Sequence, residues 1–298
     1  MLIDPKLRSA VRSFLRVGAA ALAVSLIALW AGVRWLEMNK LYYPSPVITV
    51  IPQSLGIASE DVTLTTADGV RLRGWFIPAA PFRASIKDKK LATGPLAPQN
   101  LTILFCHGNA GNISNRVDKA AVLHKLGLSV LLFDYRGFGE SEGSPSEQGT
   151  YLDADAAYRY LAETRKIPAD RIVIHGESIG NGVAIETAVR HPSRALIVES
   201  AFTSIVGMGK SVLPWLPLDW FVTYRYDNLS KIAKVRRPVL VMHSRDDEVI
   251  PYEMGRALFA AAAEPKRFLE LKGTHNDGYA DTGPAYPGAI RDFLAYQR

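Results

Sequence analysis

The five residues Gly176-Glu177-Ser178-Ile179-Gly180 constrain the fold of this chain most strongly. An apolar, β-branched run (171–175) precedes them, and the small and apolar residues that follow (181–190) suit a closely packed helix. A serine between a strand and a helix, with glycines two residues before and after it, occupies a sharp turn that exposes its hydroxyl. The turn also puts the hydroxyl at the helix N-terminus, where partial positive charge favours an anion. A chance match in a loop would lack this context, so we predict that Ser178 is a nucleophile.

The composition is that of a globular protein, with 48% hydrophobic and 21% charged residues among 298. This length suits one large α/β domain or two small ones. The net charge of +6 comes from scattered basic residues, with clusters before residue 17 and at 87–90. No motif of a nucleic-acid-binding module accompanies them, so we predict no nucleic-acid partner. The single cysteine, Cys106, ends an apolar run and is predicted to be buried; one cysteine excludes an intrachain disulfide.

The N-terminal region contains seventeen consecutive uncharged residues (17–33), flanked by Arg16 and Arg34. As a helix they span about 25 Å, enough for a bilayer core, and Trp30 and Trp35 fall where an aromatic belt belongs. Four basic residues precede the run and two follow it closely. The positive-inside rule therefore predicts a cytoplasmic N-terminus, with the remaining chain across the membrane.

Two alternatives to this membrane anchor remain. A cleaved signal peptide would need a small-x-small site after the apolar stretch, and no good site is present. A buried helix of the folded domain would normally carry a polar face, which this segment lacks. We favour an uncleaved signal anchor that comprises residues 1–37 and is followed by a proline-containing linker at 38–59.

The region after the linker is predicted to form one α/β domain at 60–298. Alternating residues at 61–66 and 70–77 around an Asp-Gly turn predict a β-hairpin, and 78–100 reads as an exposed loop. From residue 101 apolar strands alternate with helical stretches, which predicts a mainly parallel sheet with helices on both faces and the hairpin at one edge. The predicted strands are 101–106, 129–133, 171–175, 195–198, 239–243 and 266–271, and the predicted helices are 117–126, 152–165, 179–190, 252–263 and 285–296.

A nucleophilic serine needs a base to take its proton and an acid to orient that base. The order Ser178, Asp247, His275 is the order of nucleophile, acid and base in hydrolases that carry this turn. His275 is the only histidine after the predicted strand 239–243, which leads into the loop of Asp247. A lone histidine can also be an ordinary surface or core residue. Asp246 is an alternative acid, and Asp277 is better suited to orient the loop of His275.

A tetrahedral intermediate needs two backbone N–H groups for its oxyanion. One is predicted to belong to Ile179, directly after the serine, and the other to the loop after the first parallel strand. Asn109 is our choice in that loop and Ala110 the next. An alternative role for the Asn109 and Asn112 side chains is to cap the following helix, which is the expected role of Asn112.

The sequence favours no cofactor or metal. The glycines at 137–143 depart from the dinucleotide spacing, and neither a phosphate-binding G-x-x-x-x-G-K-[ST] nor an H-E-x-x-H motif occurs. Five further histidines are scattered along the chain. Two of them, His107 and His243, lie at the ends of predicted strands, before tight turns, where structural hydrogen bonding is the expected role.

Together, the motifs HGNAGN (107–112), DYRGFGESEG (134–143), GESIG (176–180), HSRDDEVIP (243–251) and GTHND (273–277) resemble the α/β-hydrolase superfamily. They look most like its membrane-anchored, single-pass members related to the serine depalmitoylases, over residues 60–298. The resemblance implies an α/β-hydrolase fold, with Ser178 as nucleophile, Asp247 as acid and His275 as base. It also implies an oxyanion hole at Asn109 and Ile179. Where the family usually has glycine after the histidine at 243, this chain has a serine at 244. This difference concerns the conformation of the turn and hardly the catalysis.

An insertion at 201–237 replaces the short crossover expected between two strands. Its aromatic and aliphatic residues suit either a small lid over the serine or additional core. We therefore expect a membrane-anchored serine hydrolase that cleaves carboxylic or thio-esters with apolar acyl groups. Prolyl-aminopeptidase-like enzymes share the general pattern, so a peptidase or amidase is the alternative, and a catalytically silent binding protein is another.

Overall fold

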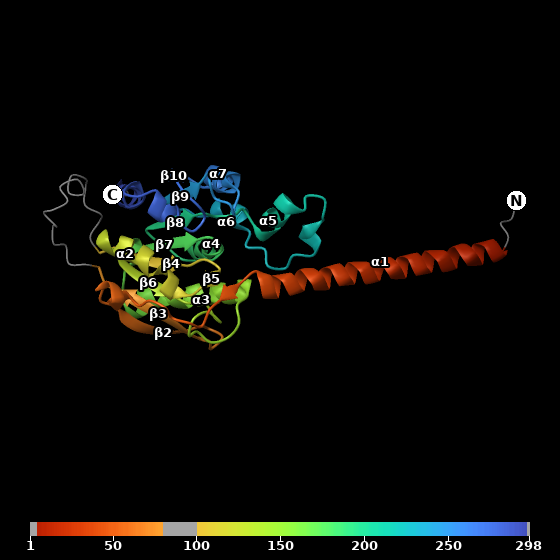
Figure 1. The fold of residues 1–298 in the computed structure, drawn as a ribbon, viewed down its shortest axis with the longest axis horizontal. Helices are drawn as coiled ribbons and strands as arrows, with labels where there is room; N and C mark the ends of the chain where they lie inside the picture. The colour runs from red at the N-terminus through yellow and green to blue at the C-terminus, as the bar shows by residue number, and fades with distance from the viewer. Residues whose placement is uncertain (1–4, 80–99, 297–298) are drawn as a thin grey trace.

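The fold is that of a computed structural model, which describes residues 5–79 and 100–296. One eight-stranded sheet runs in the order β10-β9-β8-β7-β4-β6-β3-β2 (Figure 1). Six strands are parallel, and β3 and β2 extend one edge as the predicted antiparallel hairpin. The strands are β2 Glu60–Thr65, β3 Arg71–Ile77, β4 Thr102–Cys106, β6 Ser129–Phe133, β7 Ile172–Glu177, β8 Ala195–Glu199, β9 Val239–Ser244 and β10 Lys266–Leu271.

Helices cover both faces of the sheet, as predicted. Strands β4, β7, β8 and β9 are buried along their whole length, which explains their continuous apolar runs. One apolar cluster joins one face of the sheet to α3, α4 and α7, and a second joins the other face to α2 and α9. These helices are α2 Val117–Lys125, α3 Glu147–Arg159, α4 Gly180–Arg190, α7 Tyr252–Ala261 and α9 Ala285–Tyr296, and a short α8 spans Gly278–Asp281.

Two of the predicted helices differ from the observed bounds by three or more residues at one end. The helix predicted at 152–165 begins five residues earlier, because the Ser146 hydroxyl caps it by accepting the N–H of Gly149. It ends in a π-helical turn, Tyr160–Thr164. The N-terminal helix α1, Pro5–Lys40, continues three residues into the predicted linker. The predicted exposed loop at 78–100 lies almost wholly outside the described residues.

The rest of the linker packs on the domain. Its two-residue strand β1, Tyr43–Pro44, pairs in parallel with β5, Ala110–Gly111, and a 3-10 turn follows at Pro52–Leu55. β5 belongs to the loop that follows β4, so the linker is tied to one of the segments in which the sequence predicted functional residues. A further 3-10 turn, Ile113–Arg116, leads from that loop into α2.

Helix α1 extends far from the domain as a single rod (Figure 1). The 29 residues Arg12–Lys40 are the one segment in the described part of the chain long and apolar enough to cross a membrane. The C-terminal end of α1 lies beside the insertion at 201–237, which folds into α5 Ile205–Val212, a 3-10 turn Leu218–Trp220 and α6 Asn228–Ile232.

The insertion contains both buried and exposed apolar side chains. Leu218, Phe221 and Val222 are buried and add to the core. Trp215 and Trp220 are instead 76% and 81% exposed, which is unusual for side chains that carry so much apolar surface. Part of the insertion therefore completes the fold, and part presents aromatic side chains to the surroundings.

Candidate active site

Ser178 lies in the sharp turn between β7 and α4. Its φ of 54° is the left-handed conformation that a non-glycine residue adopts only when its surroundings enforce it. The flanking glycines are required by packing. A Cβ on Gly176 would lie 2.6 Å from Cα of Asn181, and one on Gly180 would lie 2.1 Å from the carbonyl oxygen of Cys106. The close crossing of strand and helix thus explains the glycine spacing.

Ser178 and two loop residues form a hydrogen-bonded chain. Oγ of Ser178 lies 3.0 Å from Nε2 of His275, and Nδ1 of that ring lies 2.8 Å from Oδ2 of Asp247. Asp247 follows β9 and His275 follows β10, so parallel strands deliver all three residues to the same edge of the sheet. The carboxylate of Asp247 is fully buried and the His275 side chain is 9% exposed.

Asp247 is held by groups on several sides. Its Oδ1 accepts the N–H groups of Val249 and Ile250 at 3.0 and 2.7 Å, and Nε2 of His243 lies 3.2 Å from Oδ2. Burial raises the pKa of Asp247, but hydrogen bonds from His243, His275 and the backbone outweigh it, so the net pKa lies below the ordinary range. Asp247 is therefore a carboxylate at neutral pH.

The two other acid candidates are placed differently. Asp246 is exposed, and its N–H donates to the Ser244 hydroxyl. Asp277 is also exposed and accepts a hydrogen bond from the Thr274 hydroxyl at 2.7 Å. That bond lies within the loop that carries His275. Of the three aspartates, the structure therefore brings Asp247 to His275.

Two side chains that sequence reasoning did not assign a role join these loops. The Ser244 hydroxyl donates to the carbonyl oxygen of Gly273 at 2.6 Å, which links the end of β9 to the turn before His275. Glu248 accepts the backbone N–H of His275 at 3.0 Å. The serine that departs from the family pattern thus connects the loop that carries Asp247 to the loop that carries His275. His243 has the structural role predicted for it, since its Nε2 also faces the carbonyl of Ile250 at 3.1 Å.

The loop after β4 lies directly beside the serine. A Cβ on Gly108 would lie 3.4 Å from Cβ of Ser178, so a larger residue there would crowd the hydroxyl. Within the described residues, no backbone hydrogen bond engages the N–H of Asn109 or of Ile179. Asn112 caps the next helical turn through its side chain, as predicted. Both free N–H groups belong to residues that line the same pocket as Ser178.

A buried ionic cluster behind the serine was not predicted. Nζ of Lys119 lies 3.0 Å from Glu177 and 2.7 Å from Glu199, and Nε2 of His175 lies 3.0 Å from Glu199. Burial raises the pKa of Glu199, but Lys119 and His175 outweigh it and the net pKa is lowered. The sequence did contain two hints, since Glu177 lies inside the glycine motif and Lys119 interrupts an apolar helix.

His107 and Asp134 form a second buried pair, below the loop after β4. Nδ1 of His107 lies 2.7 Å from the carbonyl oxygen of Gly108, and its Nε2 lies 3.5 Å from Asp134. Burial lowers the pKa of His107 to about 3 and raises that of Asp134 to about 8. In the part of the chain that the structure describes, no group of three or more His, Cys, Asp or Glu side chains is arranged to hold a metal ion.

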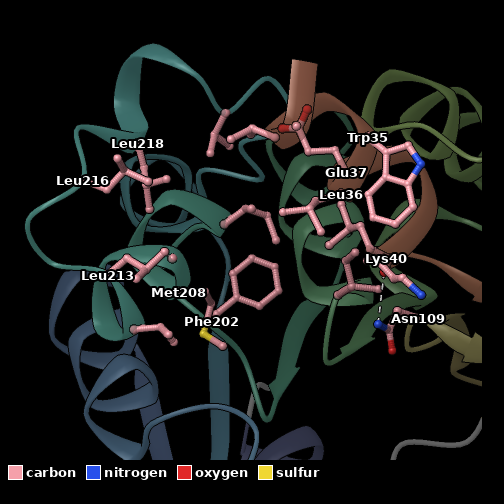
Figure 2. Close-up of a pocket in the computed structure, with 18 of the residues that line it drawn as sticks. Trp35, Leu36, Glu37, Lys40, Asn109, Phe202, Met208, Leu213, Leu216 and Leu218 are labelled. Carbon is pink, nitrogen blue, oxygen red and sulfur yellow. Dashed lines mark hydrogen bonds between the residues drawn. The ribbon is translucent and has the colours of Figure 1, made fainter. Parts of the chain in front are cut away.

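An apolar pocket of about 790 Å³ opens above the serine, with Asn109, Ser178 and Ile179 among its lining residues. This volume is typical of pockets for small organic ligands. Its walls come from two segments far apart in the sequence, the C-terminal end of α1 and the insertion. Figure 2 shows side chains of both segments facing the cavity, including Leu36 from α1 and Met208, Leu213, Leu216 and Leu218 from the insertion.

The comparisons with known proteins agree with this architecture. An uncharacterized protein of Mycobacterium tuberculosis, Rv2307c, is 40% identical over 87% of this chain and 88% of its own length. The alpha/beta hydrolase domain-containing protein WAV2 of Arabidopsis thaliana is 34% identical, and the alignment covers 82% of this chain and 81% of WAV2. The chain belongs to the α/β-hydrolase superfamily.

This α/β-hydrolase also matches a family described as serine aminopeptidase, S33, over residues 97–230. Among solved structures it resembles the Pyrococcus furiosus esterase Pf2001, with a TM-score of 0.66 and 20% identity. That comparison covers 87% of this chain and 98% of the esterase. At this identity the likeness supports the fold, which is the α/β-hydrolase fold expected from the motifs.

Proposed function

We propose that this α/β-hydrolase is a membrane-anchored serine hydrolase that cleaves carboxylic or thio-esters with apolar acyl groups. The observation that carries the proposal is the series of hydrogen bonds that joins Ser178, His275 and Asp247, together with the apolar pocket that Ser178 lines. A hydrogen-bonded serine and imidazole supply the nucleophile and base of acyl transfer. The apolar lining suits the acyl part of the substrate.

In this mechanism Nε2 of His275 takes the proton of Ser178 as Oγ attacks the ester carbonyl carbon. The Asp247 carboxylate accepts the Nδ1–H bond, which fixes the tautomer and stabilises the imidazolium that forms. The N–H groups of Asn109 and Ile179 receive the oxyanion. Collapse of the intermediate breaks the bond to the alcohol or thiol, which leaves with the proton from His275. Water then attacks the acyl carbonyl carbon as His275 takes a proton from it. The bond from the acyl carbon to Oγ breaks, His275 returns the proton to Oγ of Ser178, and the carboxylic acid leaves.

The pocket favours this function over an aminopeptidase. An aminopeptidase needs an anionic group for the substrate's charged amine. Glu37 is the one carboxylate among the described lining residues, and it is already occupied. It accepts the N–H groups of Thr223 and Tyr224 at 2.6 and 2.8 Å and pairs with Arg34. Amide hydrolysis remains the second candidate because the matched family is described as a serine aminopeptidase.

The anchoring part of the proposal rests on α1. Its length and hydropathy suit a bilayer span, and the excess of basic residues on its N-terminal side favours a cytoplasmic N-terminus. The hydrolase domain would then lie on the opposite side. Extraction of intact protein from membranes by carbonate would contradict this part, whereas extraction by detergent alone would support it.

Labelling with a fluorophosphonate probe tests the chemistry. The probe forms a bond to an activated serine, so the wild type should be labelled and Ser178→Ala should not. Ser200→Ala is the matched control, because Ser200 is also buried with a positive φ of 49°, whereas the hydroxyl beside Nε2 of His275 is that of Ser178. Unlabelled wild-type protein that is folded would favour the silent binding protein. Equal labelling of wild type and Ser178→Ala would overturn the assignment of Ser178.

A further inference from the structure

The helix that we propose as the membrane anchor is also one wall of the pocket. Ala28, Leu29, Gly32, Val33 and Leu36 of α1 line the cavity. Their spacing of three and four residues puts them on one face of the helix. The lining continues to Lys40, so α1 contributes a wall roughly 18 Å long at 1.5 Å per residue. A membrane tether alone does not require that one face of the helix line the pocket that contains Ser178.

Specific contacts fix α1 in this position. Glu37, which is 5% exposed, accepts two backbone N–H groups of the insertion, from Thr223 and Tyr224. Arg34 pairs with Glu37 and lies over the Tyr224 ring, 5.0 Å from its centroid. These charged contacts attach the end of α1 to the insertion that forms the opposite wall.

The chain just after α1 is attached to the serine side of the pocket. The Tyr43 N–H donates to the carbonyl oxygen of Asn109 at 2.8 Å, and the Asn109 side chain donates to the carbonyl of Leu41 at 3.1 Å. The Tyr42 hydroxyl lies 2.8 Å from that of Tyr226 in the buried core. The position of α1 is therefore specified relative to both the insertion and the loop beside Ser178.

The wall of the pocket overlaps the part of α1 that suits a bilayer. The uncharged run ends at Val33, and the pocket-lining face begins at Ala28. The outer end of the cavity is thus level with the end of the hydrophobic span. Trp215 and Trp220 of the insertion are exposed and lie within two residues of Leu216 and Leu218, which pack in one apolar cluster with Val33 of α1. Exposed tryptophans so close to the end of the hydrophobic span suit a membrane–water interface. An acyl chain in the surrounding leaflet would reach the cavity without crossing water.

We propose that α1 forms part of the acyl-binding site and that the substrate is a long-chain acyl ester resident in the bilayer, whose chain passes along α1 from the leaflet to Ser178. This proposal deepens the proposed function and rests on it. It assigns α1 two roles, since the same face that contacts lipid near residue 28 guides the acyl chain further along. A short or water-soluble ester would use only the end of the pocket near the serine.

Two glycines of α1 provide a matched test. A Cβ at Gly32 or at Gly18 would have no heavy atom within 4 Å, so both positions accept a side chain without a clash. Gly32 lines the pocket, whereas Gly18 lies fourteen residues earlier on the same helix and outside it. Gly32→Phe should fill part of the acyl path, while Gly18→Phe makes the same chemical change away from it.

The full-length protein would be reconstituted in phosphatidylcholine vesicles, and kcat/KM measured for p-nitrophenyl butyrate and p-nitrophenyl palmitate. We expect Gly32→Phe to lower the ratio of palmitate to butyrate hydrolysis roughly tenfold, because the lost space is needed only by the long chain. Gly18→Phe should keep the wild-type ratio. A wild-type ratio in Gly32→Phe, or an equal fall in both variants, would overturn the proposal.

A second readout does not depend on activity. Palmitic acid with a photoreactive diazirine, added to the same vesicles, should crosslink to residues 28–36 of α1 and to the insertion, and less so in Gly32→Phe than in Gly18→Phe. Absence of crosslinks from both segments would overturn the pocket proposal even if the esterase is active. Crosslinks there without any ester hydrolysis would support the pocket and contradict the proposed function instead.

Discussion

The site consists of two regions built in different ways. The polar region, at the ends of β7, β9 and β10, is a network of short hydrogen bonds in which each group has a fixed partner. The apolar region, between α1 and the insertion, surrounds a cavity of about 790 Å³, and the buried Glu37 links its two walls through two hydrogen bonds. In our proposal, the first region holds the reacting atoms and the second selects which substrates reach them. Changes in the polar region should thus lower hydrolysis of all esters alike, and changes in the apolar region should alter chain-length preference.

Among the substitutions that test this difference between the two regions, Asp247→Asn is expected to have the largest effect. Loss of the carboxylate should leave His275 in the wrong tautomer and lower kcat by about 10⁴-fold. The fall should be the same for butyrate and palmitate esters. Asp246→Asn is the matched control and should stay near wild type, because Asp246 is exposed. If Asp246→Asn abolished hydrolysis and Asp247→Asn did not, the acid assignment would be wrong.

The pKa of Asp247 adds a prediction about pH. Its hydrogen bonds lower the folded-state pKa below the value in the unfolded chain. Asp247 therefore contributes stability above its unfolded pKa, and this contribution is lost as the pH falls through the lower folded value. Thermal melts of wild type and Asp247→Asn should converge in strong acid and diverge toward neutral pH. A constant difference at every pH would contradict the lowered pKa.

Glu37→Ala should have a smaller effect, which should differ between the two esters because it changes the apolar region. It removes the acceptor of two buried N–H groups and leaves Arg34 without this partner, so α1 should no longer be held against the insertion. We expect the palmitate-to-butyrate ratio of kcat/KM to fall roughly tenfold. Met38→Ala, one position along and 57% exposed, is the control and should keep the ratio. An equal loss for both esters would mean that α1 supports the polar region instead of the pocket wall.

The smallest effect is expected for Ser244→Gly. The substitution introduces the glycine that is usual at this position in the family that the sequence motifs resemble. It also removes the hydrogen bond from the Ser244 hydroxyl to the Gly273 carbonyl oxygen. One such hydrogen bond is worth about 1 kcal/mol, so kcat should fall by less than tenfold, equally for both esters. Ser244→Thr retains a hydroxyl and should recover most of the loss. A changed chain-length preference in Ser244→Gly would break the division between the two regions.

The sequence predicted the fold better than the pocket, and the reasons are physical. Strands β6 and β10 and helix α9 have the predicted bounds, because buried strands and helices carry apolar runs with their own periodicities. The family, too, could be predicted from its motifs. The roles of Ser178, Asp247 and His275 remain predictions, although the structure brings the three side chains within hydrogen-bonding distance.

The contact between α1 and the pocket could not be predicted. An apolar helix face has the same composition whether it meets lipid or protein, so periodicity does not tell the two apart. The one local sign is Glu37, an acid that follows the uncharged run closely, whose partners lie about 186 residues away in the sequence. Similarly, Lys119 and its partner Glu199 come together only through the sheet.

The most direct test of the central claim is hydrolysis of p-nitrophenyl esters from C4 to C16 by full-length protein in vesicles, wild type beside Ser178→Ala. The account predicts hydrolysis by the wild type that rises toward long chains and falls by about 10⁶-fold at every length in Ser178→Ala. Hydrolysis that survives in Ser178→Ala, or a folded wild type that cleaves no ester of any length, would contradict it.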